Sequence, residues 1–168
     1  MFVKRIKYGH VYRWSPPGEV EHFLVLQNDT DTPWTTGPCL ATSKGNALSE
    51  DLLKYVPKGG RGEFPVTSAI NIAHDRKETE SDRKLKALQP SNNYFLDLVT
   101  LDGELAVKNF GKTPVEMIVV LSLAGKPLTT SSEAKIVLDT TNLKLLERTG
   151  SINWRIVVNP GESKPLPY

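Results

Sequence analysis

Histidine is the side chain that most readily exchanges protons near neutral pH, and the chain contains three, His10, His22 and His74. His74 precedes Asp75, and the two have the types needed for a general base and its orienting carboxylate. Together with His22 they also have the types needed to bind a metal ion. However, no two histidines stand at i, i+2 or i, i+4, and neither His-x-His nor His-Glu-x-x-His occurs. We therefore predict no metal ion and no cofactor, and name His22, His74 and Asp75 as the residues that a metal site would use.

Other catalytic patterns are also missing from the sequence. A serine nucleophile is often held in a Gly-x-Ser-x-Gly turn, which does not occur, and spacing singles out no pair of carboxylates. The glycine-rich segment 58–62 offers backbone amides and two cations to an anion, but the Lys-Ser/Thr step of a phosphate-binding loop does not follow. We predict a hairpin loop there and a protein that is not an enzyme, with a metal-dependent hydrolase as an alternative.

Aromatic side chains are the best candidates for a ligand-binding surface. The candidate set, with two nearby cations, is Trp14, Trp34, Tyr12, Tyr55, Lys58 and Arg61. Exposed aromatic rings on a β-sheet can stack on sugar rings, so a carbohydrate-binding module is an alternative function. Core packing is the other interpretation of the tryptophans. Trp34 directly follows a proline at a predicted strand start, where partial exposure is expected.

The composition of the 168-residue chain is that of an ordinary globular protein, with 39% hydrophobic and 24% charged residues. A net charge of +2 is too small to favour a nucleic acid partner. No apolar run approaches the roughly 18 residues of a membrane helix, and the first residues lack the apolar stretch of a signal peptide. The single cysteine, Cys39, excludes an intrachain disulfide. We expect a protein or glycan partner, no nucleic acid and no membrane insertion.

Alternating apolar and polar residues, interrupted by Gly, Pro, Asn and Asp, predict short β-strands along the whole chain. The expected strands are 3–14 with a turn at Gly9-His10, 20–27, 34–42, 48–55, 63–73, 90–100, 103–110, 114–123, 134–138, 143–147, 151–158 and 163–167. Residues 48–55 also fit a short helix. Asp102-Gly103 suits a two-residue hairpin turn, because both positions there need positive φ. Turns are also predicted at 28–31 and 159–162.

One strand–turn–strand phrase occurs twice. Residues 24–28 (Leu-Val-Leu-Gln-Asn) are followed by Thr-Pro at 32–33, and residues 105–109 (Leu-Ala-Val-Lys-Asn) by Thr-Pro at 113–114. The offset of 81 residues, from Asn28 to Asn109, is about the length of a small β-domain. We therefore predict an all-β fold of two tandem antiparallel β-sandwiches. The second is expected to be immunoglobulin-like or fibronectin-III-like, with Trp154 in its core.

A charged run lies between the two copies. Nine of the twelve residues 75–86 are charged, with both signs mixed. Such a run predicts a solvated connector, and a long edge strand protected by its charges is the alternative. The predicted organisation is an N-terminal β-domain at 1–78, a connector or shared edge strand at 79–88, and a C-terminal β-sandwich at 89–168.

Several turn-and-strand phrases resemble the C-terminal β-rich region of a bacterial family of unknown function, related to mucoidy-inhibitor-A-like proteins. They lie at 20–22, 28–38, 53–60, 109–114, Trp154 and 160–162. The resemblance implies an all-β, surface-exposed, non-catalytic part of a larger bacterial protein, with an envelope or secreted location. It brings no assigned site residues.

These observations together predict a non-catalytic binding or assembly module. Recognition is expected through the loops 28–36 and 57–61, or through pairing of an edge strand with a partner chain. The expectation about function rests on analogy between folds.

Overall fold

The computed structural model of the chain describes residues 6–128, 131, 133–138, 143 and 147–168. Within these residues the chain is almost entirely β, with eleven strands and no α-helix, which confirms the predicted all-β class. None of the described residues forms a helix long and apolar enough to cross a membrane.

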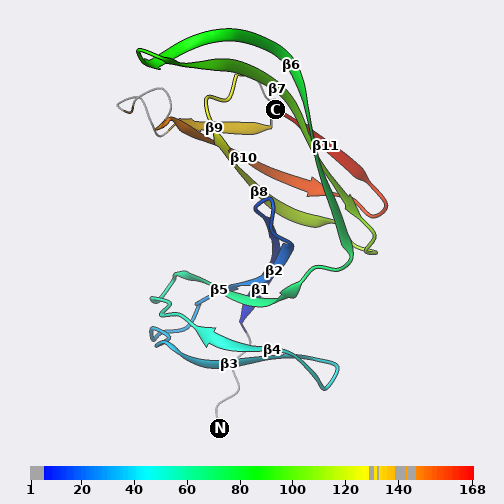
Figure 1. Ribbon diagram of the computed structural model, residues 1–168. Helices are drawn as coiled ribbons and strands as arrows, with labels where there is room; N and C mark the ends of the chain where they lie inside the picture. The colour runs from blue at the N-terminus through cyan, green and yellow to red at the C-terminus, as the bar shows by residue number, and fades with distance from the viewer. Residues whose placement is uncertain (1–5, 129–130, 132, 139–142, 144–146) are drawn as a thin grey trace.

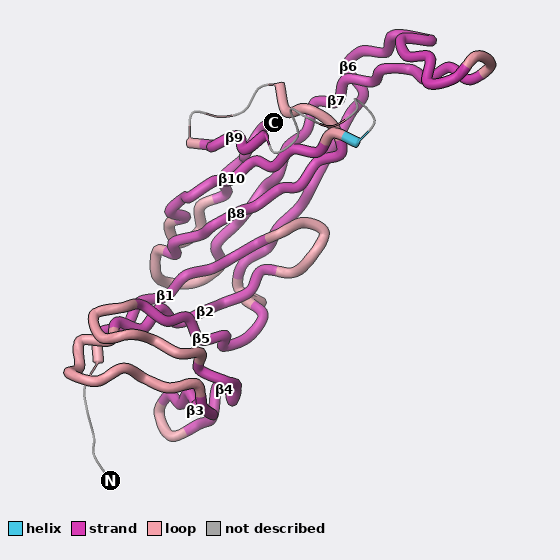
Figure 2. Tube along the Cα trace, turned by 90° about the vertical axis from the view of Figure 1, so that its left-hand side faces the viewer, coloured by secondary structure: helices cyan, strands magenta, loops and turns pink. Residues whose placement is uncertain are grey.

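The strands form three sheets (Figures 1 and 2). The six-stranded sheet has the order β5 (Arg61–Ser68), β2 (Val20–Gln27), β1 (Lys7–Trp14), β8 (Val115–Ala124), β10 (Thr149–Val158), β9 (Ala134–Leu138). The three-stranded sheet has the order β11 (Ser163–Pro167), β7 (Tyr94–Asn109), β6 (Ile72–Ser91), and the two-stranded sheet pairs β3 (Gly37–Ser43) with β4 (Asn46–Leu53). The predicted strand at 48–55 is thus confirmed as β4.

The main core lies between the three-stranded sheet and the β1–β8–β10 part of the six-stranded sheet. Its largest members include Trp14, Trp154 and Met117 on one side and Leu105 and Leu166 on the other, all 2% exposed or less. Leu105, Met117 and Trp154 come from strands whose alternate residues are buried, as the period-two pattern requires. Trp154 therefore occupies the predicted core position.

The two parts of the chain repeat one strand arrangement. The order β5-β2-β1 in the first part matches β11-β7-β6 in the second. The register also matches: Gln27, just before Asn28, pairs with Arg61, and Lys108, just before Asn109, pairs with Ser163. We call β1–β5 the first unit and β6–β11 the second unit.

The two units share a sheet instead of lying apart. Tyr12–Trp14 of β1 pairs in parallel with Met117–Val119 of β8, and this pairing makes the six-stranded sheet continuous. The predicted division into domains at 1–78 and 89–168 stays a prediction.

The charged run 75–86 lies inside β6, a 20-residue edge strand that pairs with β7 alone among the described strands. Of the two interpretations, the structure therefore has the edge strand and not an unpaired connector. The charges lie along an open edge, where they discourage pairing with another chain.

Two predicted turns are wrong, because a strand runs through each of them. Gly9-His10 lies within β1, and Asp102-Gly103 lies within β7, so that 90–100 and 103–110 are not separate strands. The hairpin turn is at residues 92–93, between the paired Ser91 and Tyr94. Gly103 is needed for another reason, because a Cβ there would overlap the ring of Tyr168. The strand predicted at 143–147 falls mostly outside the described residues.

Candidate functional site

Two buried asparagines organise the turns of the two units. Asn109 is fully buried, and its Nδ2 donates to Thr113 O at 2.9 Å and Val158 O at 3.0 Å, while its Oδ1 accepts from Gly111 N at 2.8 Å. Its backbone N donates to Glu162 O, and Gly161 N donates to Asn109 O at 2.8 Å. Asn109 therefore ties the loop 110–114 to the end of β10 through its side chain, and to the turn 159–162 through its backbone.

Asn28 has the same arrangement in the first unit. It is also fully buried, and its Nδ2 donates to Thr32 O at 3.0 Å and Val56 O at 3.2 Å. Its backbone N donates to Gly60 O, and Gly59 N donates to Asn28 O at 2.8 Å. The two asparagines found by the sequence repeat therefore lie in equivalent settings, each beside a glycine of positive φ, Gly59 at 73° and Gly161 at 76°.

The Asn28 turn brings the two predicted recognition loops together. Trp34 forms an antiparallel bridge with Val56, so the loop 28–36 lies beside the loop 57–61. Trp34 is half-buried and Tyr55 is 58% exposed. Lys58 lies 3.4 Å from Asp31, and Arg61 donates to Gln27 at 3.1 Å. Four of the six predicted ligand-binding residues, Trp34, Tyr55, Lys58 and Arg61, thus gather at one end of the first unit.

The other two predicted residues are placed differently. Trp14 is 2% exposed, and its Nε1 donates to Gly18 O at 2.9 Å, so its ring is part of the core and not of an exposed surface. Tyr12 is half-buried at the margin of that core, and burial raises its phenol pKa. Alternation in the sequence predicts a strand here, but it does not show which face of that strand another sheet covers.

The predicted metal residues do not come together. His74 and Asp75 are neighbours in β6, so their side chains lie on opposite faces of the sheet. His74 Nε2 lies 3.2 Å from Glu19 Oε2, and its ring packs on Trp14 with centroids 4.8 Å apart. No group of three or more His, Cys, Asp or Glu side chains in the described part of the chain is arranged to bind a metal ion.

His22 instead meets a histidine that sequence reasoning did not pair with it. His10 Nδ1 and His22 Nε2 are 2.8 Å apart, across the β1–β2 hairpin. Tyr12 stacks on the other side of His22, with centroids 4.6 Å apart and an interplanar angle of 11°. Burial, followed by the charge of His10, lowers the pKa of His22. The hairpin register was the missing signal, because Tyr12 faces His22 and His10 stands diagonally from it on the same face.

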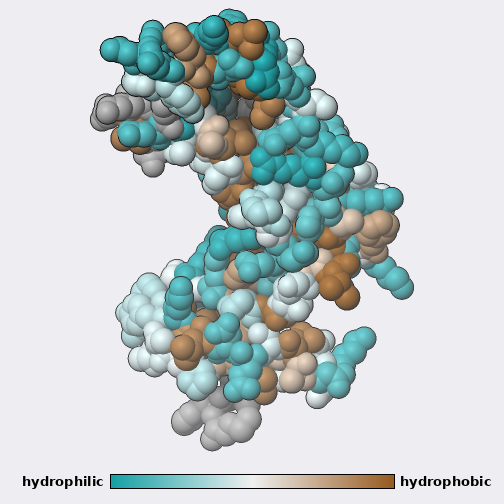
Figure 3. Space-filling view, in the orientation of Figure 1, coloured by the Kyte–Doolittle hydropathy of each residue, from teal (hydrophilic) through white to brown (hydrophobic). Residues whose placement is uncertain are grey.

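The distal half of the β6–β7 hairpin projects from the body (Figures 1 and 2). We call this segment, residues 82–101, the arm. It exposes six large apolar side chains: Leu85 72%, Tyr94 57%, Phe95 46%, Leu98 47%, Val99 37% and Leu101 49%. Along β7, alternation places Phe95, Val99 and Leu101 on one face and Tyr94 and Leu98 on the other. Figure 3 shows hydrophobic surface interspersed with hydrophilic surface at the top of the molecule, where β6 and β7 lie in Figure 1.

An ion cluster supports the arm where β6 is irregular. Arg83 donates to Glu80 at 2.8 and 2.6 Å and to Asp97 at 3.1 Å, and Asp97 also accepts from Lys86 N at 2.9 Å. The hydrogen bond from Arg83 lowers the pKa of Glu80, and that from the Lys86 amide lowers the pKa of Asp97. These contacts span the register shifts after Glu80 and Lys84 and tie β6 to β7 within the arm.

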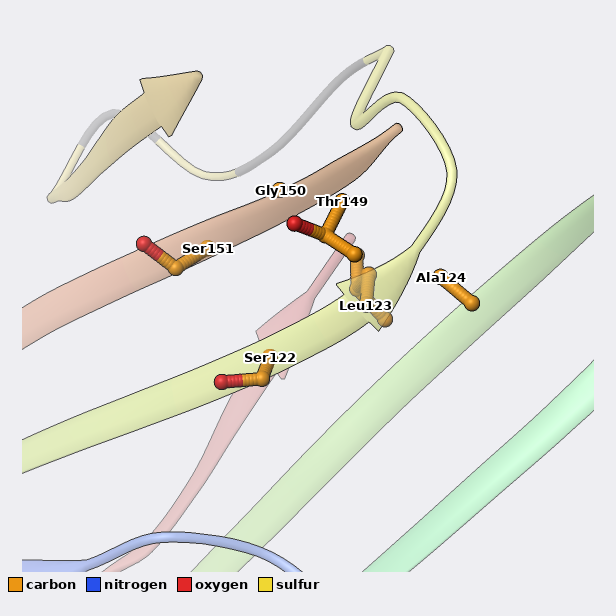
Figure 4. A pocket seen from close by; sticks show the side chains of 6 residues that line it. All are labelled: Ser122, Leu123, Ala124, Thr149, Gly150 and Ser151. Atoms are coloured by element: carbon orange, nitrogen blue, oxygen red, sulfur yellow. The ribbon is translucent and has the colours of Figure 1, made fainter. Parts of the chain in front are cut away.

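A hollow of about 470 Å³ lies at one end of β8 and β10 (Figure 4). It is lined by Ser122, Leu123, Ala124, Thr149, Gly150 and Ser151. These six residues include no acid, base or imidazole, so the hollow offers no catalytic pair.

Compared with known proteins, the chain matches no family model, no curated protein and no solved structure. The resemblance to the mucoidy-inhibitor-A-related family therefore stays a prediction.

Proposed function

We propose that this protein is a non-catalytic binding and assembly module of a larger bacterial protein, and that the arm is where a protein partner docks. The observation that carries the proposal is the exposure of six large apolar side chains on a ribbon of two strands. Large exposed apolar side chains gathered on one segment, here three on one face of β7 and two on the other, are typical of interaction sites in soluble proteins.

The small stability expected of a two-stranded ribbon on its own supports the same conclusion. An isolated two-stranded hairpin is at best marginally stable in water, and apolar residues on both faces need cover. The proximal part of the hairpin has that cover, because Leu105 and Val107 pack in the main core. In the distal part the described contacts include the strand ladder, the ion cluster and Lys86 over the ring of Phe95 at 5.6 Å, and the six apolar side chains stay exposed. A partner would supply the cover that the core gives to the proximal part.

The arm supports the proposal better than the open edge of β6 does. Edge pairing needs a flat and uncharged strand, whereas β6 carries Asp82, Arg83 and Lys84 and is interrupted by register shifts. We therefore place the contact on the apolar faces of the arm and not along its edge.

Site-specific photo-crosslinking tests this proposal in cells that produce the protein natively. A photoreactive residue replacing Leu98 in the arm should give one discrete protein adduct. The matched control replaces Leu48, which is 50% exposed on β4, and should give none. The double substitution Leu85→Ser and Tyr94→Ser should remove the Leu98 adduct, because Tyr94 lies on the same face of β7 as Leu98, and should leave the unfolding temperature nearly unchanged.

The outcomes separate the alternatives. An adduct at Trp34 or Tyr55 and none at Leu98 would move the function to the loops 28–36 and 57–61. An adduct of twice the chain mass would make the partner a second copy of this chain. No adduct at any of these positions would overturn the proposal.

A further inference from the structure

The ring nitrogens of His10 and His22 face each other across a short gap. Their distance is 2.8 Å, the ring centroids are 5.0 Å apart and the rings are within 20° of parallel. The centroids are therefore much further apart than the nitrogens, which places His10 Nδ1 and His22 Nε2 on facing edges of the two rings. The two nitrogens face each other nearly head-on across a hydrogen bond, in which one ring donates and the other accepts. Turning the exposed His10 ring would direct both nitrogens at a single ion.

The surroundings hold these rings in place. Tyr12 stacks on His22 at 4.6 Å, and Tyr8 contacts His10 edge-on at 5.6 Å. His10 is exposed and His22 is half-buried, so the gap is open to solvent on the His10 side. His22 Nε2 is thus held in place by the stacked Tyr12, whereas His10 Nδ1 belongs to an exposed ring that has room to turn.

We propose that His10 Nδ1 and His22 Nε2 form a binding site for one divalent transition-metal ion, with Cu²⁺ bound most tightly and water completing the coordination. Imidazole nitrogen suits copper, nickel and zinc, and a tetragonal Cu²⁺ site takes ligands at right angles. Two metal–nitrogen bonds of about 2.0 Å at a right angle span roughly 2.8 Å, the observed spacing. Both imidazoles bind the ion as neutral ligands, with their protons on His10 Nε2 and His22 Nδ1, so the ring that donates in the present hydrogen bond changes tautomer on binding.

The second unit shows what the same positions hold without histidines. Counted from the two asparagines, His10 and Tyr12 of β1 correspond to Arg76 and Glu78 of β6, and His22 corresponds to Gly103. There the C-terminal Tyr168 covers Gly103 and donates to Glu78 at 2.8 Å, while Arg76 donates to both side chains. The first unit has two imidazoles, joined to each other by a side-chain hydrogen bond, at the place where the second unit has an arginine paired with a carboxylate.

Calorimetric titration of the full chain with CuCl₂ at neutral pH, together with electron paramagnetic resonance, tests the site. We expect one Cu²⁺ per chain with coupling to two imidazole nitrogens, weaker Ni²⁺ and Zn²⁺ binding, and no binding of Mg²⁺. His10→Ala and His22→Phe, which keeps a ring beside Tyr12, should each lower the Cu²⁺ affinity by about tenfold or more, since even outer-shell partners of a metal contribute that much.

His74→Ala is the matched control, because His74 lies against Trp14 and Glu19 instead of another histidine. It should bind Cu²⁺ as the unaltered chain does. Unchanged affinity in both His10→Ala and His22→Phe would overturn the proposal. So would a spectrum without imidazole nitrogens, or equal binding of Mg²⁺.

Discussion

The first and second units share one turn, but the strands that follow the turn pair much more extensively in the second unit. Asn28 and Asn109 are both fully buried, both receive a glycine amide at 2.8 Å, and both donate to the carbonyl of a buried valine, Val56 or Val158. Beyond that valine the units diverge. Val158 starts a ten-residue ladder between β10 and β8, whereas Val56 makes a single bridge with Trp34.

The difference shows that the same turn can form whether or not the strands beyond it build a thick core. In the second unit, β8 and β10 supply most of the main core. In the first unit, no residue of β3 or β4 is buried, and Leu40, Leu48 and Leu52 are 56%, 50% and 57% exposed. An amide that bridges two loops can fix a turn without a thick core beneath it, because buried polar groups demand partners wherever they lie.

The largest expected difference between the units concerns two tryptophans. Trp154→Ala should lower the free energy of unfolding by about 3–5 kcal/mol, because it leaves a cavity in the main core. Trp34→Ala should cost about 1–2 kcal/mol, since Trp34 is half-exposed and its surroundings can collapse or hydrate. Urea unfolding of the two variants measures this. Equal losses would show that the first unit is as tightly packed as the second.

The next largest effect is expected from the asparagines themselves. Asn109→Ala removes the partners of Val158 O, Thr113 O and Gly111 N, and should cost about 3 kcal/mol or more. Asn28→Ala should cost less, about 1–3 kcal/mol, because β3 and β4 of the first unit bury no residue and the nearby loops can rearrange to let water replace the amide. Thermal unfolding monitored by circular dichroism compares them. A loss under about 0.5 kcal/mol for either variant would contradict its structural role.

A smaller and equal effect is expected at the two glycines of positive φ. Gly59→Ala and Gly161→Ala should each cost about 1–2 kcal/mol from backbone strain alone, since nothing lies within 4 Å of either added Cβ. Gly37→Ala is the matched control, because its added Cβ also meets nothing within 4 Å and its φ lies outside the left-handed region. Chemical denaturation should find Gly37→Ala close to the unaltered chain. Different costs at Gly59 and Gly161 would show that the two turns are not equivalent.

The smallest expected effect is a pH dependence of the folding stability that comes from Glu78 in the second unit. Hydrogen bonds from Arg76 and then from Tyr168 hold the pKa of Glu78 below its ordinary value of 4.5. The folded state is therefore stabilised above the unfolded pKa, and this contribution is lost as the pH falls through the lower folded value. Glu78→Gln should lose less stability than the unaltered chain between about pH 5 and pH 3. Denaturant midpoints across this range measure it, and parallel pH profiles would show that the ion pair contributes nothing.

Local features of the fold could be predicted from the sequence, because they depend on neighbouring residues. The turns at 28–31 and 159–162 follow from short polar side chains and glycine, and the repeated Asn-to-Thr-Pro phrase indicates two equivalent turns. Asp102-Gly103 has the residue types of a hairpin turn, which is why a turn is predicted there, but the two residues lie within β7. The ring of Tyr168, 65 residues further along, is what requires glycine there.

Contacts between distant strands could not be predicted in the same way. The parallel pairing of β1 with β8 depends on how the units pack, which no local pattern records. Likewise, the separation of 12 residues between His10 and His22 suggests no shared site. Only the register of the β1–β2 hairpin brings the two rings to one face.

Amide hydrogen exchange by nuclear magnetic resonance tests the equivalence of the two turns most directly. Gly59 N donates to Asn28 O and Gly161 N donates to Asn109 O, each at 2.8 Å. We predict that both amides exchange far more slowly than in an unstructured chain, with Gly161 the slower because a ten-residue ladder adjoins its turn. If Gly59 exchanges at the unstructured rate while Gly161 is protected, or if neither is protected, the two units do not share one turn.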